Sequence, residues 1–151
     1  MRDQHIAHVN IATLRHAKGD ARVQPFFDAV PKINALAERS PGFVWRLTDE
    51  AEEAKASALF GEANLAIAIS VWENVDALRE FVYASAHGGF LRQRGDWFVP
   101  RSAANKALWW VEPGTQPTVL EAKHRLDWLN KNGAGDIAFG FSQHIVSERT
   151  Q

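Results

Sequence analysis

The sequence contains no cysteine, which excludes disulfide bonds and thiolate chemistry and leaves histidine, aspartate and glutamate to hold any metal. No apolar run approaches the roughly 20 residues that span a bilayer, and the first residues lack an apolar core of signal-peptide length. We therefore expect a cytoplasmic protein. Neither sign of charge is in excess, since the chain has 17 basic and 18 acidic residues. Nucleic acid and anionic membranes are therefore not expected partners.

The composition is that of an ordinary globular domain, with 151 residues of which 46% are hydrophobic and 23% charged. This length can bury a core without cross-links and predicts a single domain over residues 1–151. Tryptophan is frequent, whereas tyrosine and methionine occur once each. The tryptophans are Trp45, Trp72, Trp97, Trp109, Trp110 and Trp128. They indicate either a bulky core or a lined pocket.

Hydrophobic periodicity divides the chain into strands and helices. Strands are expected at 5–14, 43–50, 64–73, 106–112 and, at an edge, 138–141. Helices are expected at 24–40, with a kink or break at Pro31, and at 74–86 and 117–133. The acidic connector 49–63 is expected to be a solvated surface that either forms a helical turn or stays mobile, and 87–100 to be a short irregular helix and loop. The order predicts an α+β, ferredoxin-like antiparallel sheet with helices on one face and an added C-terminal helix and edge strand.

Side-chain alternation sorts each expected strand into two faces. In strand 64–73 one face carries only large aliphatic residues, and the other carries Ala66, Ala68, Ser70 and Trp72. His8, Asn10 and Arg46 fall on the small-residue side of their own strands. We expect helices to cover the aliphatic face and leave the small-residue face turned away from them. Because that face is too apolar for water, a second copy stacked on it about a two-fold axis is the economical cover, with a tail of the same chain as the alternative.

Small residues leave space, and a few polar residues can orient whatever fills it. His8 and Asn10 are either a hydrogen-bonded core pair or substrate-orienting groups. Arg46 is the strongest candidate, because a guanidinium among apolar residues needs an anion, either a bound acid or a carboxylate side chain. The other candidate substrate-binding residues are Trp45, Ser70, Trp72, Trp97 and Trp109. Of these, Trp97 fits a core position better than a stacking platform.

The segment that follows the helix at 74–86 carries a second group of candidates. His87 precedes two glycines, so it either closes the helix favourably or acts as a general base or haem ligand. Arg94 is either a solvated charge or the partner of a carboxylate or haem propionate. No histidine pair has zinc-type spacing, and no nucleophile elbow, Walker loop or dinucleotide fingerprint is present.

Several segments resemble one bacterial family of domains of unknown function (domain of unknown function 3291). They are HIAHVNIATL, PGFVWRL, LAIAISVWENVDALREFVY, HGGFLRQRGDWF, PTVLEAKHRLDWL and AFGF. The family is placed among the dimeric α/β-barrel proteins, near the antibiotic-biosynthesis monooxygenases. The resemblance implies a ferredoxin-like homodimer with one site per subunit. It leaves the chemistry open, because the superfamily includes cofactor-free monooxygenases, haem-binding oxygenases, isomerases and ligand-binding proteins.

Three functions follow as hypotheses. The first is a monooxygenase-like enzyme, cofactor-free or haem-dependent, that acts on an apolar or aromatic small molecule. Without a cofactor, His87 or His8 removes a proton, and Asn10 and Arg46 stabilise the anion that reacts with oxygen. With haem, His87 is the expected ligand. The second is a binding protein without catalysis, and the third is a purely structural dimer without a cavity.

Overall fold

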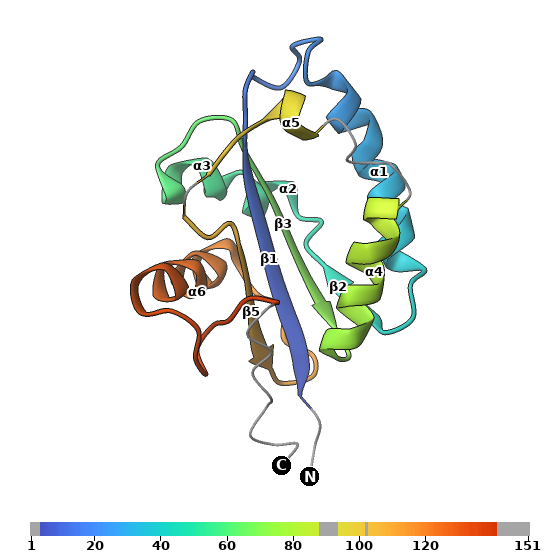
Figure 1. Ribbon diagram of the computed structural model, residues 1–151, viewed down its shortest axis with the longest axis vertical. Coiled ribbons are helices and arrows are strands. Elements are labelled where there is room, and N and C mark those ends of the chain that lie inside the picture. The colour runs from blue at the N-terminus through green and yellow to red at the C-terminus, as the bar shows by residue number, and fades with distance from the viewer. Residues whose placement is uncertain (1–3, 88–93, 102, 142–151) are drawn as a thin grey trace.

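The computed structural model describes residues 4–87, 94–101 and 103–141, without the side chains of residues 86, 87 and 94. The chain order of its elements is shown in Figure 1. The strands are β1 (His5–Leu14), β2 (Phe43–Arg46), β3 (Leu65–Trp72), β4 (Phe98–Val99) and β5 (Lys106–Val111). The helices are α1 (Gln24–Glu38), α2 (Glu50–Glu53), α3 (Lys55–Phe60), α4 (Val75–His87), α5 (Arg94–Trp97) and α6 (Val119–Asn132).

All strand pairs in the sheet are antiparallel. The order is β2, β3, β1, and the free side of β1 is shared by β5 along its first half and by β4 at its end. Strands β1, β2, β3 and β5, with α1 and α4 as connections, give the ferredoxin-like arrangement. The α+β fold predicted from the element order is therefore confirmed.

Local sequence signals place most helix ends. Asn74 caps α4 by accepting a hydrogen bond from the backbone N–H of Ala77 at 2.8 Å. In α6, Glu121 and Arg125 are four residues apart and form an ion pair at 2.8 Å. The predicted break at Pro31 is wrong, because α1 runs through this residue as one helix. Pro31 is exposed, and at this position a proline removes one helix hydrogen bond and crowds the preceding turn without ending the helix.

The connector between β2 and β3 is helical, one of the two predicted alternatives, but it is more buried than predicted. Strand β2 ends at Arg46, and the Asp49 carboxylate then caps α2 by accepting from two backbone N–H groups. The connector is more than a solvated surface, since Ala56 is buried and Phe60 packs beside it against the sheet. The reason is the spacing of its apolar residues, which gives α3 an inward face. The predicted strand at 138–141 is reduced to one bridge, between Phe139 and Leu108.

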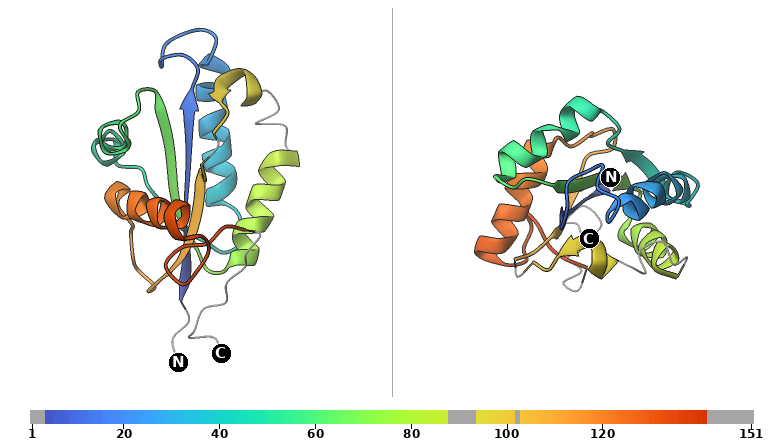
Figure 2. Two further views of the ribbon diagram at one scale, coloured as in Figure 1. Left: turned by 60° about the vertical axis from the view of Figure 1, so that its left-hand side comes forward. Right: turned by 90° about the horizontal axis from the view of Figure 1, so that it is seen from above.

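Helices lie on both faces of the sheet. The aliphatic face packs against α3 and α6, whereas α1 and α4 lie on the side of the small-residue face, as Figure 2 shows. The expectation that the small-residue face is turned away from helices is therefore wrong. The connector and the C-terminal segment supply two further helices that occupy the aliphatic face. Helices therefore lie over both faces of the sheet, and the homodimer stays a prediction.

Within the part of the chain that the structure describes, no helix is long and apolar enough to cross a membrane.

Candidate functional site

Helix α1 packs against a buried cluster at each of its two ends. At its start, Phe26 and Phe27 pack against a buried cluster that contains Leu14 and Trp97. At its end, Ala37 belongs to another cluster, formed by Ile6, Trp72, Val75, Leu78, Leu108 and Phe139. The residues of β1 between these two clusters are His8, Asn10 and Ala12 on this face, so they lie under the middle of the helix.

The middle of this face is accessible to solvent. Ala12 and Ala66 are only half-buried, and Ala68 is exposed. Of the 15 residues of α1, only Ala37 is buried, so the helix does not press its apolar stripe onto the sheet. We call the residues beneath it the small-residue site. It consists of His8, Asn10, Ala12, Ala66, Ala68 and Ser70.

His8 is the most deeply buried polar residue of this site. It is 8% exposed, and its ring lies 5.7 Å from that of Phe141. Its Nε2 atom is buried and has no hydrogen-bond partner among the described residues. Burial and the positive charge of Lys106 lower the pKa of His8 to about 3. The imidazole is therefore neutral at pH 7, with an unsatisfied nitrogen facing the site.

Polar groups surround His8 without contacting it. In the register of the sheet, His8 faces Ser70, and Asn10 faces Ala68 on one side and Lys106 on the other. The Ser70 hydroxyl accepts a hydrogen bond from the Trp72 indole at 2.9 Å. Sequence analysis missed Lys106, although it begins the strand at 106–112 and alternation places it on the face of Leu108. The site therefore combines small apolar residues with one neutral imidazole, one amide and one cation.

Arg46 is engaged by a side chain of the same chain. Its Nε donates to the Glu38 carboxylate at 2.7 Å, which joins the edge strand β2 to the end of α1. The guanidinium is 26% exposed. The sequence analysis left two alternatives for the anion that pairs with Arg46, a bound acid or a carboxylate side chain. The structure shows the carboxylate of Glu38, which sequence analysis did not identify as the partner.

The tryptophans do not line one cavity. Trp45 and Trp109 pack on the aliphatic face, on the side of the sheet away from His8. Trp72 and Trp97 are buried in the two clusters that anchor the ends of α1. Of the two alternatives, a bulky core and a lined pocket, the structure shows these four tryptophans in core clusters on the two faces of the sheet. The core interpretation holds for Trp97 in particular, which is 4% exposed.

His87 and Arg94 are placed only by their backbones. His87 is the last residue of α4, where a helix end was predicted, and Arg94 begins α5. Their side chains lie outside the description, so their roles toward haem or substrate stay predictions. Within residues 4–87, 94–101 and 103–141, no group of three or more histidines and carboxylates could hold a metal ion.

Comparisons with known proteins give one family and a set of distant structures. The family described as "Domain of unknown function (DUF3291)" matches residues 5–151, as the resemblance predicted. No curated protein matches the chain. A crystal structure of SnoaB, a cofactor-independent oxygenase from Streptomyces nogalater, is 22% identical over 76% of this chain and 98% of that chain, with a TM-score of 0.44. A structure of a SnoaB mutant is 18% identical over 74% and 95%, with a TM-score of 0.45.

Proposed function

The chain belongs to the DUF3291 family, and we propose that it binds an apolar or aromatic small molecule with an acidic hydroxyl group in the small-residue site and oxygenates it without a cofactor. The observation that carries this proposal is the buried, unpaired Nε2 atom of His8. A buried polar atom without a partner costs about 1–3 kcal/mol, and a ligand hydroxyl that meets Nε2 removes this cost.

The surroundings of His8 favour a flat, largely apolar ligand. Ala12, Ala66 and Ala68 give an apolar floor without bulky side chains, and solvent reaches all three. Such a surface, with a few convergent polar groups, is the usual composition of small-molecule sites. The nearby Lys106 charge stabilises a negative charge that develops on the ligand, and the Asn10 amide can donate to the same oxygen. Phenols and enols have the required acidity and shape.

These groups support a simple sequence of events. The ligand hydroxyl donates a hydrogen bond to Nε2 of His8, which orients it, and the hydroxyl proton leaves to water as the anion forms near Lys106. The phenolate or enolate, held near Lys106, gives one electron to dioxygen. The two radicals then combine through a new carbon–oxygen bond, and the peroxide takes up a proton. The chain itself binds, orients and stabilises the anion, and dioxygen is the oxidant.

A second function is favoured by the same low pKa. A neutral imidazole that resists protonation is a weak general base, which suits a protein that binds its ligand without turnover. The haem-dependent alternative rests on His87 and stays a prediction from the sequence. It predicts a Soret band after expression with iron and haem precursor, and the loss of that band in His87→Ala.

The proposal is tested with 2-naphthol and naphthalene as a matched pair of probes. We expect 2-naphthol to bind more tightly to the wild-type protein, and His8→Phe to weaken its affinity about tenfold, the loss of one hydrogen bond to a buried group. His124→Gln, on the outward side of α6, serves as the control and should bind as the wild type does. Equal affinities of both probes for wild type and His8→Phe would show that the site does not recognise a hydroxyl group.

Oxygen consumption separates the two functions. Uptake of dioxygen in the presence of an enolisable aromatic probe, reduced in His8→Phe and Lys106→Met, supports the oxygenase. Tight binding with no uptake for any phenol or enol supports the binding protein.

A further inference from the structure

The segment that follows α6 passes alongside β5 and reaches α4 (Figure 2). Near its start, Arg125 of α6 donates to the Ile137 carbonyl at 2.8 Å. Phe139 then exchanges two backbone hydrogen bonds with Leu108, at 2.8 and 2.9 Å. Leu108 lies directly opposite His8 in the register of β1 and β5. The segment is therefore fixed to the strand next to His8.

Phe141 is the residue of this segment that covers His8. The centroids of the two rings are 5.7 Å apart, and the Phe141 side chain packs against the cluster that contains Leu108 and Phe139. On the other side of β1, His8 faces the small residue Ser70. An aromatic ring in contact with an imidazole keeps water from it. Loss of the Phe141 ring is therefore expected to expose His8 to solvent.

Arg79 of α4 holds Phe141 in this place. Its Nη2 atom donates to the Phe141 carbonyl at 2.6 Å and so joins residues that are 62 positions apart in the chain. Its Nη1 atom is 4.0 Å from the carboxylate of Asp76, whose side chain is 88% exposed. A hydrogen bond from a charged donor is strong, whereas an exposed pair at this distance contributes little. The bond to the carbonyl is therefore the contact that directs Arg79.

We infer that Arg79 is a positioning residue for the small-residue site, because it fixes the Phe141 ring over His8. The inference rests on the proposed function, in which Nε2 of His8 accepts a hydrogen bond from the ligand hydroxyl. Only a neutral imidazole can accept a hydrogen bond. By keeping water from His8, the Phe141 ring disfavours protonation of the imidazole and preserves the acceptor in acidic solution.

The charges around His8 do not account for this effect of the ring. Burial is the larger cause of the low pKa of His8, and the charged group that lowers the pKa further is Lys106. Strand β3 carries no titratable residue. Among the described side chains of α1 and α4, the titratable groups other than Arg79 are all exposed, namely Asp28, Lys32, Glu38, Asp76, Glu80 and Tyr83. Arg79 is therefore expected to act on His8 through the Phe141 ring.

NMR titration of the His8 ring protons in the ligand-free protein tests the inference. We expect Phe141→Ala and Arg79→Met each to raise the pKa of His8 from about 3 toward 6.5, because water then reaches the imidazole. Arg79→Lys keeps a charged donor and should stay closer to the wild type. In the Phe141→Ala background, Arg79→Met should cause no further change, since the ring through which Arg79 acts is gone.

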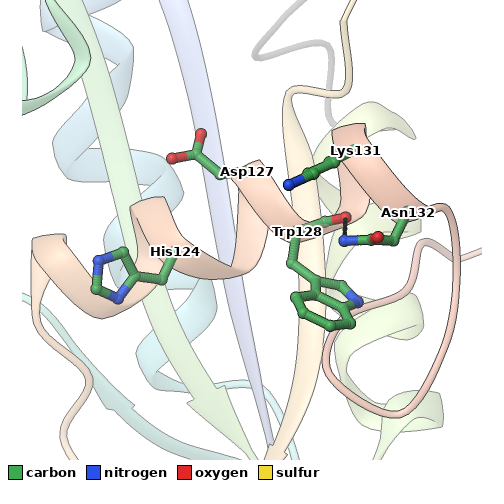
Figure 3. A pocket seen from close by; sticks show the side chains of 5 residues that line it. All are labelled: His124, Asp127, Trp128, Lys131 and Asn132. Carbon is green, nitrogen blue, oxygen red and sulfur yellow. Dashed lines mark hydrogen bonds between the residues drawn. The ribbon is translucent and has the colours of Figure 1, made fainter.

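Two variants serve as matched controls. Asp76→Asn removes the other group near Arg79 and leaves the bond to the Phe141 carbonyl in place. Asn132→Ala removes a similar bond from a side chain to a carbonyl, that of Trp128 at 3.2 Å. This second bond lies in a groove on α6 (Figure 3). Neither control should change the pKa of His8.

An unchanged pKa of His8 in Arg79→Met or in Phe141→Ala overturns the inference. An equal rise of this pKa caused by Arg79→Met with and without the Phe141 ring also overturns it, because Arg79 would then act directly. Affinity for 2-naphthol is measured on the same samples. Arg79→Met should bind more weakly at pH 5 than at pH 7, whereas wild type should bind equally at both. The titration needs no ligand, so a lack of 2-naphthol binding by all samples contradicts the proposed function alone.

Discussion

His8 lies directly opposite Ser70 in the register of β1 and β3, yet the Ser70 hydroxyl is bound by the Trp72 indole at 2.9 Å. The Nε2 atom of the imidazole has no hydrogen-bond partner among the described residues. A buried nitrogen therefore lies one strand away from a hydroxyl that accepts from a different side chain.

The stability of the protein should depend on pH through His8. The pKa of His8 in the folded protein is about 3, below the ordinary value of 6.5. Between pH 3 and pH 6.5 the unfolded chain therefore binds a proton at His8, whereas the folded protein does not. The contribution of neutral His8 is complete above pH 6.5 and is lost as the pH falls toward 3. At pH 5 the loss amounts to about 2 kcal/mol. Urea unfolding of wild type and His8→Phe at pH 5 and 7 measures it.

In His8→Phe this part of the pH dependence should vanish. Ser70→Ala serves as the control, since it changes a neighbouring uncharged group and should shift stability equally at both pH values. If the free energy of unfolding fell equally between pH 7 and pH 5 in wild type and in His8→Phe, the pH dependence would not come from His8.

Lys106→Met should raise the pKa of His8. The mutation removes the positive charge that opposes protonation of the imidazole, while burial, the larger cause, remains. The His8 pKa should therefore move upward yet stay below 6.5. Titration of the His8 ring protons by NMR gives the shift, with Lys55→Met on the other side of the sheet as a control. An unchanged or lower His8 pKa in Lys106→Met would show that this lysine does not act on the site.

The pair formed by Arg46 and Glu38 should contribute little to stability. The two side chains are 26% and 48% exposed, and pairs at such positions are worth about 0.2–1 kcal/mol. Arg46→Met, Glu38→Gln and the double variant should thus each reduce the free energy of unfolding by less than about 1 kcal/mol. Ligand binding provides a second readout. Loss of affinity in Arg46→Met but not in Glu38→Gln would show that the guanidinium also contacts the ligand.

Gly42 should be intolerant of any side chain. Its φ is +83°, and a Cβ atom would lie 2.5 Å from the Cβ of Ala77 on α4. Gly42→Ala combines backbone strain with a steric clash and should cost about 2–4 kcal/mol. Gly114 is the matched control, with φ +92° and no atom within 4 Å of the added Cβ. Gly114→Ala should cost only about 1 kcal/mol of strain. Equal losses in urea unfolding would show that the approach of α4 to Gly42 is not restrictive.

Much of the fold could be predicted from the sequence because its signals are local. Alternation in LAIAISVW sorts the side chains of β3 correctly, and Asn74 caps α4 through a hydrogen bond that spans three residues. The membership of His8 and Asn10 in the small-residue face follows from the same alternation. These features depend on a few neighbouring residues, so composition and spacing suffice to find them.

The sequence by itself determined the order of the elements and the two faces of each strand, whereas only the tertiary structure decided what covers those faces. Four helices cover the two faces of the sheet. Helices α3 and α6 pack on the aliphatic face, and α1 and α4 lie on the small-residue face. The low pKa of His8 and the capture of Arg46 by Glu38 arise in the same way. Phe141 and Lys106 come from segments distant from His8 in the chain, whereas Glu38 is eight residues from Arg46 and reaches it only because α1 and β2 turn back on each other.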